Sequence, residues 1–99
     1  MKPDKKLMLK ISLPVSFFKE GATFIAYSPS LDLSTSAKSF EQAKRRFNEV
    51  VEIFFEELMS KGTLEKVLTE LGWQKIQKQW IPPTLIAQES ETFKLSFAN

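Results

Sequence analysis

The side chains that most enzymes use for acid–base and nucleophilic chemistry are scarce in this chain of 99 residues. It contains no histidine and no cysteine, so it offers neither imidazole nor thiolate as catalyst or zinc ligand. Its three glycines are far apart and cannot form a glycine-rich phosphate loop. This composition favours a binding function over an enzymatic one, and it predicts neither a catalytic residue, nor a metal site, nor a cofactor.

One polar group could still support chemistry. If residues 31–37 form a strand, Asp32, Ser34 and Ser36 alternate onto the same face. A carboxylate beside two hydroxyls is the closest approach to a catalytic cluster in the chain. The same pattern is typical of a solvent-exposed strand face, and that is the interpretation we favour.

Charge is distributed unevenly along the chain, although the net charge is only +2. Residues 1–46 carry nine basic and four acidic side chains, whereas residues 47–70 carry six acidic and two basic ones. The acidic stretch includes Glu49, Glu52 and Glu56, which we predict to bind a basic protein partner. The alternative is surface charge that the helix merely tolerates.

A second set of residues could bind nucleic acid. Basic side chains at Lys44, Arg45 and Arg46, and at Lys75 and Lys78 beside Trp73 and Trp80, could contact phosphates and stack bases. The tryptophans could equally anchor the core or a protein interface, and we include both among the candidate partner-binding residues. The basic cluster could equally be simple exposed surface.

The elements that would position these residues begin with three strands. Apolar residues occupy every second position at Leu7, Leu9, Ile11, Leu13, Val15 and Phe17, which predicts a strand over residues 7–18. Pro14 cannot donate to a ladder, so this strand should lie at an edge or a bulge. Lys19–Ala22 predicts a turn with Gly21 at positive φ, followed by strands over residues 23–27 and 31–37.

A long amphipathic helix should follow. Ser39 and Gln42 match a capping box, and Gly62 predicts the end of the helix, giving Phe40–Lys61. Its apolar stripe is formed by Phe40, Ala43, Phe47, Val50, Val51, Phe54 and Leu58. Thr63 predicts the cap of a short second helix that ends at Leu71, before Gly72.

The C-terminal third has a weaker pattern. Residues 73–80 fit either a strand or an amphipathic turn, and Pro82-Pro83 predicts an extended link. Thr84–Ala87 and Thr92–Phe97 predict two short strands that close as a hairpin. We therefore expect a single α+β domain over residues 1–99: an antiparallel β-sheet in β-β-β-α order, a short second helix, C-terminal strands, and one long helix packed on a face of the sheet.

The segment from Ala26 to Leu33, followed by the opening of the helix at Ser39–Ala43, resembles the HicB-like antitoxins. Members typically show a turn glycine, an A-x-x-P-x-L strand end, a polar loop and an E-x-A pattern at the helix start. The resemblance covers about residues 7–60. It implies a partial ribonuclease-H-like fold in β-β-β-α-β order without ribonuclease activity, a small basic HicA-type toxin as partner, and a homodimer or higher homo-oligomer.

The chain also departs from that family. Ala37-Lys38 stands where members often keep a glycine, and residues 73–99 show no clear DNA-binding module, so DNA binding remains open. A solitary homo-oligomer without a toxin is a further alternative, with Phe18, Ile25 and Tyr27 on a second sheet face. No run of apolar residues suggests a membrane span and the N-terminus alternates like a strand rather than a signal peptide, so we expect a cytoplasmic location.

Overall fold

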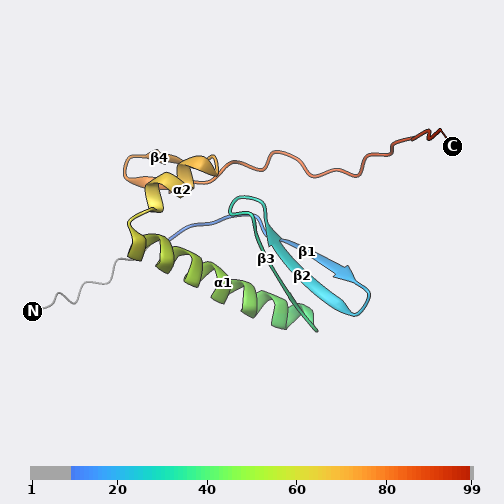
Figure 1. Ribbon diagram of the computed structural model, residues 1–99, viewed down its shortest axis with the longest axis horizontal. Helices are drawn as coiled ribbons and strands as arrows, with labels where there is room; N and C mark the ends of the chain where they lie inside the picture. The colour runs from blue at the N-terminus through green and yellow to red at the C-terminus, as the bar shows by residue number, and fades with distance from the viewer. Residues whose placement is uncertain (1–9, 99) are drawn as a thin grey trace, which may run out of the picture.

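The described part of the chain, residues 10–98 of a computed structural model, has an α+β fold (Figure 1). In chain order its elements are β1 (Ser16–Glu20), β2 (Thr23–Ser28), β3 (Leu33–Ala37), α1 (Phe40–Lys61), α2 (Leu64–Glu70), β4 (Gln74–Ile76) and β5 (Gln79–Ile81). The β-β-β-α order, the short second helix and the strands after it confirm the predicted fold class.

The first three strands form an antiparallel sheet in the order β1-β2-β3. A two-residue turn joins β1 to β2, and Gly21 occupies it at a φ of 60°, as the sequence predicts. Ala26 pairs with Phe17 on one side and with Thr35 on the other, so these three side chains share one face. Helix α1 covers that face, mainly over β2 and β3.

Strand β1 is much shorter than the predicted strand over residues 7–18. Residues 7–9 lie outside the described part of the chain, and residues 10–15 are not in a strand. Tyr27, the partner of Ser16, is followed within two residues by the turn at Pro29, so β2 leaves the sheet before it can pair further. Ile11 and Leu13 nevertheless pack against buried residues of the core, as their alternation in the sequence predicts.

Helix α1 begins and ends as the sequence predicts. The hydroxyl of Ser39 accepts a hydrogen bond from the backbone N–H of Gln42 at 3.1 Å, and Oε1 of Gln42 accepts one from the N–H of Lys38 at 3.1 Å. Gly62 ends the helix at a φ of 69°, and the N–H of Thr63 reaches back to the carbonyl of Leu58 at 2.9 Å.

Two clusters of buried residues lie along α1. The first joins the sheet to the N-terminal half of the helix and consists of Ala26, Ala37, Ala43 and Phe47. The second joins the C-terminal half of α1 to the turn after β2 and to α2, and consists of Leu31, Leu58, Leu68 and Trp73. The predicted stripe of α1 therefore serves both clusters, with Phe47 in the first and Phe54 packed against the second.

The second helix starts at the predicted place without the predicted cap. Thr63 makes no capping hydrogen bond through its side chain. Its backbone lies at φ −111° and ψ 13°, whereas the true cap Ser39 is extended at φ −145° and ψ 160°. A capping hydroxyl needs the extended conformation to face the free N–H groups. Thr63 instead follows directly on the end of α1, where its own N–H donates to the carbonyl of Leu58.

Residues 73–80, which the sequence leaves open between strand and turn, form most of a hairpin. β4 pairs with β5 in a separate two-stranded sheet. Gln77 and Lys78 make the turn with φ values of 51° and 67°, a combination that asparagine and glycine usually supply. The C-terminal strands thus lie earlier in the chain than predicted.

The predicted closing hairpin of Thr84–Ala87 and Thr92–Phe97 is wrong. Residues 82–98 contain no helix or strand and lead away from the rest of the molecule (Figure 1). Two short strands alone are at best marginally stable in water, and within residues 10–98 this segment pairs with no strand. The radius of gyration is 17.5 Å, whereas a compact chain of this length has about 13 Å.

Ser28 is completely buried, and its Oγ has no hydrogen-bond partner within the described residues. An unsatisfied buried hydroxyl lowers stability by about 1–3 kcal/mol. We therefore expect Ser28→Ala to raise the free energy of unfolding by roughly 1 kcal/mol, as measured by urea denaturation. Ser34→Ala, at an exposed position of the neighbouring strand, is the control and should change stability by less than about 0.5 kcal/mol. A destabilised Ser28→Ala protein would contradict this account.

Candidate protein-binding surface

The middle turns of α1 carry an acidic surface. Its exposed side chains, which we call the acidic face, are Glu49, Glu52, Ile53, Glu56 and Glu57. Their spacing follows the three- and four-residue steps that align side chains on one side of a helix. The ion pair of Glu57 with Lys61, at 3.3 Å, is the only one on this face between two described residues. The remaining carboxylates therefore project a concentrated negative charge.

Ile53 is the member of this surface that charge patterns did not identify. Its side chain is 59% exposed, although the helix has two buried clusters available to apolar residues. Glu49 lies one turn before it and Glu57 one turn after it. A signal was present in the sequence, because Ile53 falls outside the apolar stripe and among the glutamates. An exposed apolar side chain surrounded by polar ones matches the apolar centre and polar rim of protein interfaces.

The basic residues at the start of α1 are partly occupied by the fold. Nη1 of Arg46 donates to the backbone carbonyl of Ser36 at 3.0 Å and ties the helix to β3. Nζ of Lys44 lies 5.4 Å from the centre of the Phe40 ring. Arg45 is exposed. Of the three cations proposed to contact phosphates, only Arg46 joins α1 to another element, while Lys44 contacts a residue of its own helix.

The other proposed nucleic-acid contacts lie on the β4–β5 hairpin. Nζ of Lys75 stands 5.8 Å from the centre of the Trp80 ring, and Lys78 forms the hairpin turn. The hairpin and the start of α1 are at opposite ends of that helix (Figure 1), whose 22 residues span about 33 Å. The structure does not bring the two basic groups together.

The two tryptophans have different positions. Trp73 is only 3% exposed, and its Nε1 donates to the backbone carbonyl of Ser30 at 2.8 Å. Its ring meets Phe55 edge to face, with centroids 6.4 Å apart. Trp73 therefore belongs to the core and offers no surface to a partner or a base. Trp80 is half-buried against the same cluster.

Asp32 does not sit on the strand face that its alternation predicts. It lies in the turn before β3 with a φ of 53°, and its N–H donates to the carbonyl of Pro29 at 3.3 Å. Its Oδ1 accepts a hydrogen bond from the Tyr27 hydroxyl at 3.4 Å. Because β2 and β3 pair only from Leu33 onward, Asp32 belongs to the turn and not to the strand. Ser34 and Ser36 remain together on the exposed strand face.

The face of the sheet opposite α1 carries apolar residues. Phe18 pairs with Ile25, which also pairs with Ser36, while Tyr27 pairs with Ser16 and Ser34. These side chains point away from the helix-facing residues Ala26 and Phe24. Phe18 is 51% exposed. The structure thus groups Phe18, Ile25 and Tyr27 on a second sheet face, as the sequence predicts.

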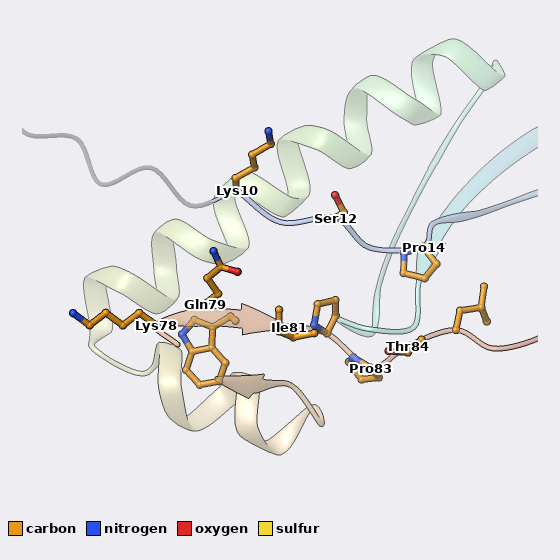
Figure 2. A pocket seen from close by; sticks show the side chains of 11 residues that line it. Lys10, Ser12, Pro14, Lys78, Gln79, Ile81, Pro83 and Thr84 are labelled. Atoms are coloured by element: carbon orange, nitrogen blue, oxygen red, sulfur yellow. The ribbon is translucent and has the colours of Figure 1, made fainter. Parts of the chain in front are cut away.

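A cleft of about 670 Å³ separates residues 10–14 from the end of the hairpin (Figure 2). Its walls include Ser12, Pro14, Ile81 and Pro83, and Lys10 and Lys78 stand at its edges. Figure 2 shows both lysine side chains directed outward instead of toward a common point. Small-molecule sites contain a few polar groups that converge on the ligand. The two lysines of this cleft do not converge, so the cleft lacks this feature.

The described residues contain no group of three or more carboxylates placed to hold a metal ion, and within them no helix has the length and apolar character needed to cross a membrane. Comparison of the chain with protein-family models, with curated proteins and with solved structures finds no match. The acidic face is therefore interpreted from its own geometry and charge.

Proposed function

We propose that this chain is a non-catalytic protein-binding domain that inhibits a small basic ribonuclease of the HicA type. The single observation that carries the proposal is the acidic face, in which the exposed Ile53 is set among four glutamates. Protein interfaces combine an apolar centre with a polar rim, and here the rim is acidic. Negative potential over such a surface raises the association rate of a basic partner.

Rigidity of the acidic face also supports this proposal. Helix α1 is held from behind by both buried clusters and at its ends by the Ser39 cap and the Gly62 turn. A surface that is already ordered loses little conformational entropy on binding. For an RNA-cleaving toxin that binds phosphates through basic residues, a row of carboxylates would compete for the same residues as RNA does.

The first test uses the small protein encoded by the neighbouring reading frame. We expect that protein to be short, basic and histidine-containing, to cleave RNA when purified alone, and to lose this activity when the present chain is added in equal amount. Calorimetry should show binding that weakens as salt increases. Undiminished cleavage at equimolar or higher concentration would reject the inhibitor role.

A gel shift with RNA and DNA separates this function from a nucleic-acid-binding regulator. We expect no shift with single- or double-stranded probes at about 50 mM salt, where phosphate contacts are strongest. A shift that disappears between about 50 and 200 mM salt, and that is lost in Arg45→Ala, would favour the regulator instead. Arg45 is the suitable position because it is exposed, whereas Arg46 also bonds to β3.

A further inference from the structure

The extended C-terminal segment exposes a strand-like apolar pattern. Phe93, Leu95 and Phe97 alternate with Lys94 and Ser96, and the three apolar side chains are 74–82% exposed. Alternation of this kind is typical of a strand that buries one face. We propose that residues 92–97 add as a strand to the free edge of β1 in a second copy of this chain, and that the exchange is reciprocal.

The edge of β1 is open and its apolar surface is incomplete. Among the described residues β1 pairs only with β2. Phe17 points to the helix side, meets Phe40 edge to face at 4.9 Å between centroids, and both rings are about 40% exposed. Beside them a groove of about 560 Å³ runs between residues 11–15 and α1, lined by Leu13, Val15, Phe47 and Val51 among others. One further strand at this edge would extend the helix-facing surface as far as Val15, which lines the groove.

An antiparallel strand can be aligned with this edge so that two apolar pairs form on the helix side. With Lys94 opposite Phe18, Leu95 lies opposite Phe17 and Phe97 opposite Val15 on the helix side. Lys94 then lies diagonal to Glu20 on the other side, within reach for an attractive charge pair. The same register places Phe93 opposite Lys19, whose Nζ lies 5.7 Å from the centre of the Phe24 ring. Backbone hydrogen bonds along the ladder supply affinity, as in other cases of strand addition.

The segment cannot fill the edge of its own sheet. Pro14, just before β1, lines the same cleft as Pro83 and Leu85 (Figure 2), so the tail leaves the domain beside the start of its own β1. At about 3.3 Å per residue, the residues that could run along β1 are 87–91, which are mostly polar. Residues 92–97 then lie beyond the end of β1, and they are positioned to reach another molecule.

The exposed area of the chain is large enough for an interface with a second copy. The whole chain exposes 8431 Å², whereas a compact monomer of its mass, 11.4 kDa, exposes about 5,800 Å². Subtracting the largest area that residues 1–9 could contribute, roughly 1,600 Å² for a fully extended segment, still leaves an excess of about 1,000 Å². A standard interface buries about 800 Å² on each partner. When the tail of each copy adds to the sheet of the other, the two identical contacts are related by a two-fold axis and form a closed dimer.

The oligomeric state tests the proposal directly. We expect analytical ultracentrifugation to give twice the mass of 11.4 kDa for the full chain. The triple variant Phe93→Ser, Leu95→Ser and Phe97→Ser should sediment as a monomer, with dimer affinity reduced by roughly 100-fold or more. The matched control Ile86→Ser changes a tail side chain that is 92% exposed and should remain a dimer. A monomeric full chain, or a triple variant that stays dimeric, would overturn the proposal.

Disulfide trapping distinguishes exchange from folding back. The chain has no cysteine, so Phe18→Cys and Lys94→Cys can be introduced singly. Directly opposed residues in an antiparallel pair lie about 4.5–5.5 Å apart at Cα, a distance that a disulfide can bridge. Mixing the two single variants under mild oxidation should give a disulfide-linked heterodimer. In the double variant, an internal disulfide in a monomer would show that the strand docks on its own sheet. Glu52 of the acidic face also lines the groove beside β1, but both measurements are made without a partner and therefore test self-association independently of the proposed function.

Discussion

Replacing Trp73 by alanine should lower the free energy of unfolding by about 3–5 kcal/mol, the usual cost of truncating a buried aromatic residue. Trp73 is 3% exposed and packs with Leu31, Leu58 and Leu68. It is also the only residue that donates a buried side-chain hydrogen bond between distant parts of the described chain, to the carbonyl of Ser30. Since domains of this size are stable by about 5–15 kcal/mol, Trp73→Ala should be largely unfolded at moderate urea.

Trp73→Phe separates the two contributions of this residue. Phenylalanine keeps an aromatic ring next to Phe55, but it leaves the Ser30 carbonyl without its donor, at a cost of about 1–3 kcal/mol. Ile86→Ala, at an exposed position in the tail, is the control and should change stability by less than about 0.5 kcal/mol. Urea denaturation followed by circular dichroism measures all three. If Trp73→Ala and Ile86→Ala unfold at the same urea concentration, the second cluster does not hold the fold together.

Local signals in the sequence were sufficient for the centre of this fold. The Ser39–Gln42 capping box and Gly62 determine the ends of α1 through hydrogen bonds to their own neighbours. Gly21 determines its turn through its own backbone freedom. These features depend on residues within a few positions of one another, so a reader of the sequence can identify them without knowing the tertiary structure.

Features that need a distant partner were the ones predicted incorrectly. The predicted strand over residues 7–18 is confirmed from Ser16 onward and is wrong over residues 10–15, because β2, which would have to continue beside them, turns at Pro29. Residues 92–97 have the alternation of a strand, yet they pair with no strand in the described part of the chain. Periodicity in the sequence indicates on which face of a strand the apolar side chains lie. It does not report whether a neighbouring strand is present.

The same distinction applies to the candidate site. Exposure of Glu49, Glu52 and Glu56 follows from the apolar stripe that points the other way, so spacing along the helix is enough to predict it. Burial of Trp73 depends on the carbonyl of Ser30, 43 residues earlier in the chain. Of the five cations predicted to contact nucleic acid, three lie at the start of α1 and two on the hairpin near its other end (Figure 1), and only the folded arrangement shows this separation.

Reversing the charge of Glu52 and Glu56 together should weaken binding to a small basic protein partner by roughly 10- to 100-fold, or about 1.4–2.7 kcal/mol. The loss should fall mainly on the association rate, because the glutamates surround Ile53 instead of filling the centre of the interface. The salt dependence should also become flatter, since fewer attractive charges remain to be screened. Stopped-flow or surface-plasmon measurements at two salt concentrations test both expectations.

A matched double variant, Glu65→Lys with Glu70→Lys, determines whether the acidic face itself is responsible. Both of these glutamates are exposed on α2, and the variant changes the net charge of the chain by the same amount. If long-range attraction to the whole molecule dominates, both double variants should lose association rate equally. If the acidic face docks the partner, the α2 variant should bind nearly as the original chain does, while Ile53→Ser should speed dissociation without changing the salt dependence. Equal affinity of all three variants and the original chain would place the partner elsewhere on the molecule.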